Sequence, residues 1–574
     1  MKKILAEIDD FIKEYENGTI TISDDIEWPM RETVKQITHY ILSRYMDGGN
    51  DNKDPITKLR RPFRNIGNFI VDLEWRAKNI DRKSIEAHAT DGDHLFSLVT
   101  NKELQLWMKN NNFGATIDDY QRKKSEYGGV LLKKTELDDE LIIDVVQWSN
   151  VSVDPSDISG GMKVEAHDLT LLDLRKKAEA WDVSSESENE TNLELAVALA
   201  MKKKERRIQI LDIEGEFLHC DVYEDEDSDD ETIGLYNLKV AVVGSKKFVV
   251  YREKLKESRF KYFSRKKVEQ RDLGLGVWEE VFESQINTNE AVIAQKEAVD
   301  LGGKVVIKTN KAGLRDGMSL MQGELIDLDE DEIFEPVSLS PRTFPEYQAL
   351  IDAWFLNTQR DQSAFPGVSG EEPKSSTPGI SLELQAAQGG SIFNKRRDQD
   401  GYDIIEVIVD WVLPFIVKKI NKEHKLTASY SATELQLLDE AITNDRMKNA
   451  VMLKGGLVTL ELKEEFKANL RKQGDTRTLT VPPGYITMKK IKQKLRFDIT
   501  DEMKDDQRHL NALAMTLSTL APDDPARAAI IAEMMEITGL SAATFPIGKA
   551  TEKPTMPKGN SSTINDVLPE GQKV

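Results

Sequence analysis

The sequence VWEEVFESQINTNEAVIAQKEAVDLGG at residues 277–303 decides the fold expected for the central part of this chain. Its apolar residues recur at three- and four-residue spacing, which is the periodicity of an amphipathic helix. The run ends at Gly302 and Gly303, and glycine is common just past a helix C-terminus. We therefore predict one long helix that starts after Gly276. Its apolar positions are Val277, Trp278, Val281, Phe282, Ile286, Val292, Ile293 and Val299.

A second amphipathic helix is predicted over residues 343–365, TFPEYQALIDAWFLNTQRDQSAF. The Thr343 hydroxyl can cap backbone N–H groups of the first turn while Glu346 reaches back, which is a capping box. Pro345 falls in the first turn, where its missing N–H group is harmless. The expected apolar stripe consists of Tyr347, Leu350, Ile351, Trp354 and Phe355.

The segments beside the second helix differ from it in composition. The roughly 40 residues between the two helices include KVVIK at 304–308 and an acidic run at 324–335, and we expect a compact insertion that contains strands. Residues 366–379, PGVSGEEPKSSTPG, contain too much Gly, Pro and Ser for regular structure and predict a mobile loop. A further helical region begins at Ser381.

The rest of the chain mixes both secondary structures. Apolar alternation at 142–146, 238–243 and 248–251 predicts short paired strands in a small sheet or barrel. The acidic run at 224–231 is interpreted as a solvated loop. The C-terminal third begins with a capping box at 431–434 and predicts short helices, and residues after 550 are too polar to order themselves. The fold class is therefore α+β, predominantly helical.

Length, charge and cysteine content limit the functional class. A chain of 574 residues exceeds what one core usually serves, so we expect several domains or one elongated subunit. The formal net charge of −22 argues against a protein that wraps DNA by neutralising phosphates. The most apolar stretch, 404–417, is too short to span a bilayer, and the charged N-terminus does not fit a signal peptide. A lone Cys220 excludes intrachain disulfides.

The order of these parts resembles that of the portal proteins of tailed double-stranded-DNA bacteriophages, over about residues 120–550. The segment RDLGLGVWEE at 271–280 resembles the glycine-containing start of the portal stem, and Gln285, Asn287 and Asn289 fall in the helix that follows. SEYGG at 125–129 and VSVDP at 151–155 resemble wing strands, whereas LRFDITDEMK at 495–504 resembles part of the crown. No single motif among these is specific, and it is their joint order that carries the resemblance.

The resemblance implies a division of the chain into named parts. The wing would be α+β, with an N-terminal helical region, and the crown would be helical. The boundaries that we expect are 1–272 for the wing, 273–303 for the first stem helix, 304–341 for the clip, 342–365 for the second stem helix, 366–380 for the tunnel loop, 381–430 for a bent helix returning to the wing, 431–550 for the crown and 551–574 for a flexible tail.

The resemblance also implies a function. A portal protein is a structural protein of the virion that forms a ring, in this family of twelve copies, at one capsid vertex. Double-stranded DNA is packaged and ejected through its channel. Its expected partners are the terminase large subunit, the head–tail adaptor, and the major capsid and scaffolding proteins, with no membrane. Its expected location is the host cytoplasm during assembly and the portal vertex of the virion afterwards.

Two groups of charged residues are candidates for contacts with these partners. Lys374 in the loop and Lys395, Arg396 and Arg397 in the following helix are candidates for touching DNA phosphate, although a solvent-facing or subunit-pairing role is an equal alternative. The acidic clip segment is either a solvated rim or a docking surface for the terminase and adaptor. Its candidate residues are Asp327, Asp329, Glu330, Asp331 and Glu332.

We find no catalytic constellation in the sequence and expect neither enzymatic activity nor a cofactor. The motif GSK at 244–246 lacks the glycine and the Ser/Thr of a phosphate loop. The cluster HATDGDH at 88–94 could in principle hold a divalent metal, but its central glycine favours a surface turn, so no metal site is predicted. A metal-dependent nuclease built on this cluster and a non-viral oligomeric scaffold remain alternatives, and only the portal hypothesis requires a ring with a central hole.

Overall fold

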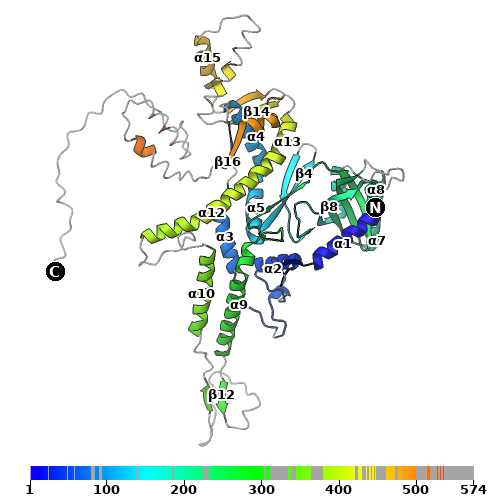
Figure 1. Cartoon of the computed structure of the whole chain (residues 1–574), viewed down its shortest axis with the longest axis vertical. Coiled ribbons are helices and arrows are strands. Elements are labelled where there is room, and N and C mark those ends of the chain that lie inside the picture. The colour runs from blue at the N-terminus through cyan, green and yellow to red at the C-terminus, as the bar shows by residue number, and fades with distance from the viewer. Residues whose placement is uncertain are drawn as a thin grey trace, which may run out of the picture. The chain divides into compact units, whose positions relative to one another are not determined.

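The protein, seen in a computed structural model, mixes helices and strands and belongs to the α+β class (Figure 1). It forms two compact units, Met1–Ile499 and Thr500–Val574, and the named helices and strands belong to the first. The second unit is described at 513–517, which are helical, and at a few positions up to 534. The structure describes residues 2–534 with gaps, the longest being 224–231, 310–333, 338–343, 363–378, 448–459, 500–512 and 518–526.

A five-stranded antiparallel sheet in the order β10-β9-β8-β7-β6 is the largest sheet of the described chain. The predicted pairing of the strands at 238–243 and 248–251 is confirmed, because β9 and β10 run antiparallel side by side. The strand bounds are Val151–Val153 for β6, Lys163–Thr170 for β7, Arg207–Leu218 for β8, Ile233–Val243 for β9 and Lys246–Lys254 for β10.

Both faces of this sheet are apolar, and helices cover both. On β8, Leu211 and Ile213 point to the face covered by α1, whereas Ile208 and Ile210 point to the face covered by α6 and α7. The period of two along a strand produces this division, because successive side chains lie on opposite faces. The helix bounds are Lys2–Asn17 for α1, Leu171–Ala180 for α6, Ser187–Lys203 for α7 and His219–Tyr223 for α8.

A second sheet of three strands, in the order β11-β4-β5, lies between two larger apolar cores. Val130 and Leu132 of β4 enter the core shared with α4, α5 and α13, and Leu131 enters the core shared with α2, α3 and the start of α9. Alternation along one strand therefore ties the two cores together. The bounds are Gly129–Leu137 for β4, Glu140–Val145 for β5, Phe260–Ser264 for β11, Met30–Ile41 for α2, Ile66–Lys78 for α3, His94–Asn110 for α4 and Phe113–Tyr127 for α5.

The two long helices predicted from the sequence are α9, Val277–Gly302, and α10, Phe344–Asp361, and they pack side by side (Figure 1). Between them, β12 at Val306–Thr309 pairs antiparallel with β13 at Phe334–Val337, which confirms a strand-containing insertion. The expected tunnel loop lies outside the described residues up to 378, as do the Thr343 cap and the expected tail.

Amide side chains of α9 hold the N-terminus of α3. The Gln285 side chain, which is fully buried, accepts hydrogen bonds from the Ile66 and Gly67 N–H groups at 2.8 and 3.2 Å. Asn289 accepts one from the Arg64 N–H group at 3.0 Å. The first N–H groups of a helix have no partner within the helix, so these contacts satisfy donors that burial would otherwise leave costly.

The helix predicted from Ser381 begins at Gly379, and a π-helical segment interrupts it. It consists of α12, Gly379–Val407, the π-helical segment η5, Ile408–Val412, and α13, Leu413–Ile420. Pro414 explains the irregular turn, because its ring would clash with the carbonyl group four residues earlier in a regular α-helix. The wider turn lets the Leu413 N–H group reach the Ile408 carbonyl oxygen instead.

The expectation of helices throughout 431–550 is wrong at two places. β15 at Thr476–Val481 pairs with β14 at His424–Ser429, and β16 at Leu495–Ile499 pairs with β3 at Ile85–Ala89. The sequence TRTLTV of β15 alternates and is rich in β-branched residues, which favour strands. The remaining named elements are helices at Leu460–Arg471 (α15) and Met488–Lys494 (α16), a 3₁₀ helix at Gly49–Asp51 (η1), and a hairpin of β1, Ile20–Ser23, with β2, Ile26–Trp28.

No helix in the part of the chain that the structure describes has the combination of length and apolar character that crossing a bilayer requires.

Glycines allow two backbone segments, at Gly128 and at Gly274, to lie in close contact at the start of α9. Gly128 ends α5 with a φ of +83°, a left-handed conformation that suits a helix C-terminus. A β-carbon there would overlap the Gly274 carbonyl oxygen, and one at Gly274 would overlap the Gly128 carbonyl oxygen. The glycines of the segment 271–280 therefore let α9 begin directly against the α5–β4 junction.

We predict that Gly128→Ala destabilises the protein by about 3 kcal/mol or more, because backbone strain and a backbone clash add up. Gly484→Ala is the matched control, since Gly484 has a φ of +72° but, apart from its chain neighbours, no described residue has an atom within 4 Å of the position that an alanine methyl group would occupy. This substitution should lower the free energy of unfolding by only about 1–2 kcal/mol, the cost of a left-handed backbone conformation for alanine. Urea unfolding followed by circular dichroism measures the free energy of unfolding of both variants. Equal losses of stability would show that the backbone segments at Gly128 and Gly274 are not in close contact.

Candidate functional site

The described basic candidates on α12 have different surroundings. Lys395 is exposed, Arg396 is partly buried, and Arg397 is 7% exposed. The Arg396 guanidinium lies 2.7 Å from a carboxylate oxygen of Glu74. Lys374 and the five acidic clip candidates lie outside the described residues. Among the four residues predicted to contact DNA, Lys395 is therefore the described residue whose side chain is exposed to solvent.

Arg396 leads to a buried cluster of charges where α12 meets α3. Glu74, on α3, is 1% exposed and lies within 3.1 Å of three cationic side chains. Arg265, just after β11, donates to both of its carboxylate oxygens, at 3.1 and 3.0 Å. Lys78, one turn along α3, lies 3.0 Å away. Burial alone would raise the pKa of Glu74, but Lys78, Arg265 and Arg396 hold it well below its usual value.

The cluster continues through α12 to α5. Asp400, 2% exposed, lies 3.1 Å from the Lys78 amine and 2.7 Å from that of Lys124, which also reaches Asp403 at 2.5 Å. The positions 396, 400 and 403 lie on one face of α12, as the helical repeat requires. Arg265 also pairs with Glu280 of α9 at 3.0 Å. We call this set the Glu74 cluster, and it joins α3, α5, α9 and α12.

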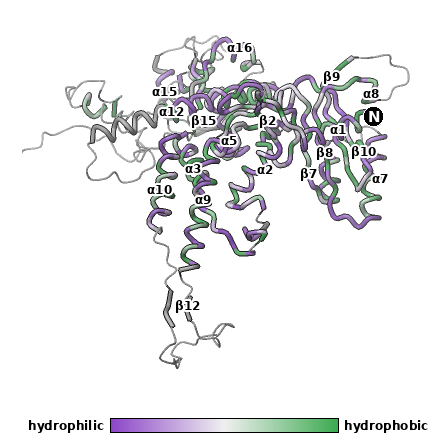
Figure 2. The backbone as a smooth tube through the Cα atoms, turned by 60° about the horizontal axis from the view of Figure 1, so that its bottom comes forward, coloured by the Kyte–Doolittle hydropathy of each residue, from purple (hydrophilic) through white to green (hydrophobic). Residues whose placement is uncertain are grey.

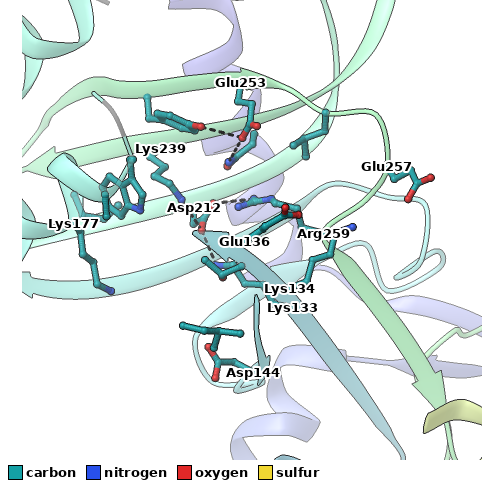
Figure 3. Close-up of a pocket in the computed structure, with 18 of the residues that line it drawn as sticks. Lys133, Lys134, Glu136, Asp144, Lys177, Asp212, Lys239, Glu253, Glu257 and Arg259 are labelled. Carbon is teal, nitrogen blue, oxygen red and sulfur yellow. Dashed lines mark hydrogen bonds and ion pairs between the residues drawn. The ribbon is translucent and has the colours of Figure 1, made fainter. Parts of the chain in front are cut away.

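A second buried charge, Asp212 on β8, lies at the floor of a cleft of about 1130 Å³. Figure 3 shows three cationic side chains that converge on it. Lys133 of β4 lies 2.6 Å from Asp212, and Lys239 of β9 and Arg259, just before β11, both lie at 3.0 Å. Because Lys133 and Arg259 belong to the three-stranded sheet and its flank, these ion pairs join the two sheets. We call this set the Asp212 cluster.

The Asp212 cluster changes the acidity of its members. Despite burial, the cations Lys239, Arg259 and Lys133 hold the pKa of Asp212 well below its usual value. Burial lowers the pKa of Lys239 to about 8, with Arg259 and Lys133 acting in the same direction against Asp212. The Lys239 amine also lies 4.6 Å from the centre of the Trp181 ring, a cation–π contact. The Asp212 carboxylate already forms ion pairs with three cations. This geometry therefore suits a structural role, holding the two sheets together, better than acid–base catalysis.

The sequence analysis did not identify Glu74 or Asp212 as central residues. Glu74 has no distinctive local signal, because Asp72, Arg76 and Lys78 of α3 are charged as well. For the Asp212 pair the signal is a charged residue among apolar ones in a strand, as Asp212 in RIQILDIEGEFL of β8 and Lys239 in IGLYNLKVAVV of β9. The strand register places Asp212 directly opposite Lys239, which makes the pair a cross-strand ion pair. The pattern is therefore visible in the sequence only once the pairing of β8 with β9 is known.

The histidine cluster at 88–94 falls partly outside the described residues. His88 is an exposed residue of β3, opposite Arg496 of β16, and residues 90–93 are not described. Among the residues that the structure does describe, no three His, Cys, Asp or Glu side chains lie close enough together to hold a metal ion. The nuclease alternative therefore gains no support from the described geometry.

Comparison with known proteins does not assign the chain to a family. No protein-family model matches it, and no curated protein matches its sequence. Any functional assignment therefore depends on the order and geometry of the elements described above.

We predict that Glu74→Gln lowers the free energy of unfolding by about 3–5 kcal/mol, because it leaves buried cations without their counter-charge. The control is Glu406→Gln, since Glu406 pairs with Lys261 at 2.8 Å but is 57% exposed, and its loss should cost less than about 1 kcal/mol. Urea unfolding compares the two variants. Losses of similar size would mean that the Glu74 cluster adds no more than a surface ion pair.

The pKa of Lys239 predicts how stability depends on pH. Its pKa is lower in the folded protein than in the unfolded chain, so the unfolded chain binds more protons between about pH 8 and 10.5. The contribution of Lys239 to stability should therefore rise across this window, by up to about 3 kcal/mol. Thermal melting of the wild type and of Lys239→Met at several pH values isolates this term. A constant difference between the two proteins would contradict the lowered pKa.

Proposed function

We propose that this chain is the subunit of a portal, a ring at a phage capsid vertex through which double-stranded DNA passes. The observation that carries the proposal is the order of elements from 277 to 420. Helix α9 leads into a two-stranded insertion, α10 returns beside α9, and the bent helix α12–η5–α13 follows. This order agrees with the stem, clip, stem and wing-directed helix that the resemblance implies.

The outer surfaces of the stem helices support assembly with further copies. Leu350 and Leu356 on α10 are 47% and 45% exposed, and the exposed Ala353 lies between them on the same helical stripe. On α9, Ile286 and Val299 are 39% and 53% exposed. Single exposed apolar residues are ordinary, but a stripe along a helix that already packs against a partner favours burial against a neighbour. A head-to-tail contact of this kind closes into a ring when its rotation allows.

The negative net charge of the chain supports a channel along which DNA slides without adhering to the wall. Each copy carries a formal net charge of −22, so the ring as a whole would repel phosphate. Lys395 offers a local cation, whereas Arg396 is already matched by Glu74. Such a cation in the channel would make brief contacts, because salt screens charges beyond a Debye length of about 8 Å.

The proposal extends to partners. The β12–β13 pair frames the acidic segment that holds Asp327, Asp329, Glu330, Asp331 and Glu332. As the clip, this segment would dock the terminase during packaging and the head–tail adaptor afterwards. The major capsid and scaffolding proteins would contact the wing. The complex would form in the host cytoplasm and end in the virion, with no enzymatic activity of its own.

We predict that the double variant Leu350→Glu, Leu356→Glu reduces the assembled fraction at least tenfold, because carboxylates at a subunit interface are costly to bury. Leu106→Glu is the control, since Leu106 is an exposed leucine of α4 at 43%. Size-exclusion chromatography with light scattering gives the mass, and circular dichroism shows that each variant is folded. Assembly unchanged in the α10 variant would contradict the proposed stem interface.

A further inference from the structure

Helix α7 is apolar around its whole circumference over residues 195–201, LAVALAM. Its inner face packs Ala196, Val197 and Ala200 against the five-stranded sheet, where they are buried. Leu195 and Met201, which lie at different angles around the same helix, are 53% and 52% exposed. The middle of α7 is accordingly hydrophobic in Figure 2. A surface helix of a globular protein normally has one polar face, and a helix that is apolar all round is normally covered all round.

A groove runs between α7 and α6, with a volume of about 480 Å³. This is within the range of about 300–1,000 Å³ that is typical of ligand pockets. The apolar residues that line the groove are Ala178, Val183, Leu193, Val197, Ala198 and Met201.

The charges along the groove decide what can occupy it. Its charged lining residues are Arg175 and the three carboxylates Glu179, Glu190 and Glu194, so the rim has a net charge of −2. A second copy of the chain placed face to face would bring two acidic rims together, because a twofold contact pairs a surface with itself. Like charges opposed across an interface are costly. A basic partner would match both the rim and the apolar floor.

We propose that the α6–α7 groove is a docking site for an amphipathic helix, rich in lysine or arginine, of another protein. Apolar residues of that helix at positions i, i+3, i+4 and i+7 would enter the groove. Its cations would face Glu179, Glu190 and Glu194. The site is distinct from the stem and clip and does not depend on whether the chain forms a ring.

The probe is a labelled synthetic peptide with leucine at positions i, i+3, i+4 and i+7 and lysine elsewhere. Its binding to the full chain is measured by fluorescence anisotropy at low salt. Glu190→Gln with Glu194→Gln should weaken binding about three- to tenfold, because rim charges contribute modestly. Glu464→Gln with Glu465→Gln makes the same change of charge at exposed positions of α15 and should leave binding unchanged.

A second variant tests the apolar part of the site. Met201→Gln should weaken binding about tenfold at both low and high salt, because it removes an apolar contact and no charge. Three results would overturn the proposal. One is equal binding of a peptide of the same composition with its leucines spread around the helix, and another is an equal loss in the α15 control. The third is self-association of the chain that Met201→Gln abolishes, which would make a second copy the occupant.

Discussion

A carboxylate that is almost completely buried, Glu74, holds the start of α9 and the middle of α12 in place relative to α3 and α5. Taking one charge out of water is costly, and the cost is offset only when counter-charges and hydrogen bonds surround it. Arg265, Lys78 and Arg396 supply them, and Asp400 extends the pairing to Lys124. The start of α9 and the middle of α12 are thus held by charges that must all be present together.

The Asp212 cluster applies the same principle between the two sheets. Both carboxylates have pKa values held well below the usual range, so both contribute stability at neutral pH. That contribution is lost as the pH falls through the pKa of the folded protein, because protonation of either carboxylate leaves its cations unmatched. At low pH, the elements that the Glu74 and Asp212 clusters join, including the start of the proposed stem, should therefore lose these contacts before the apolar cores are affected.

Local pattern in the sequence correctly predicted α9, α10, the helical region that begins near Ser381 and the pairing of β9 with β10. These depend on local patterns of three to four or of two residues. It missed β15 and β16, since β16 pairs with β3 from the far end of the unit and a strand needs its partner to be recognised. The sequence made Arg396 a candidate for contact with DNA, and no local pattern reveals that it pairs with Glu74 of α3. Arg396 is 322 positions from Glu74 and Asp400 is 276 from Lys124, so only the folded chain brings these charges together.

The central claim is that copies of this chain close into a ring around a channel. Electron-microscopic imaging of the purified full-length protein tests it most directly, because neither a monomer nor a channel-free scaffold gives the same projection. We expect class averages viewed down the axis to show a ring of identical subunits with a central hole wide enough for duplex DNA, about twelve in number as the resemblance implies. Uniform monomers, or closed assemblies without an axial hole, would contradict the claim.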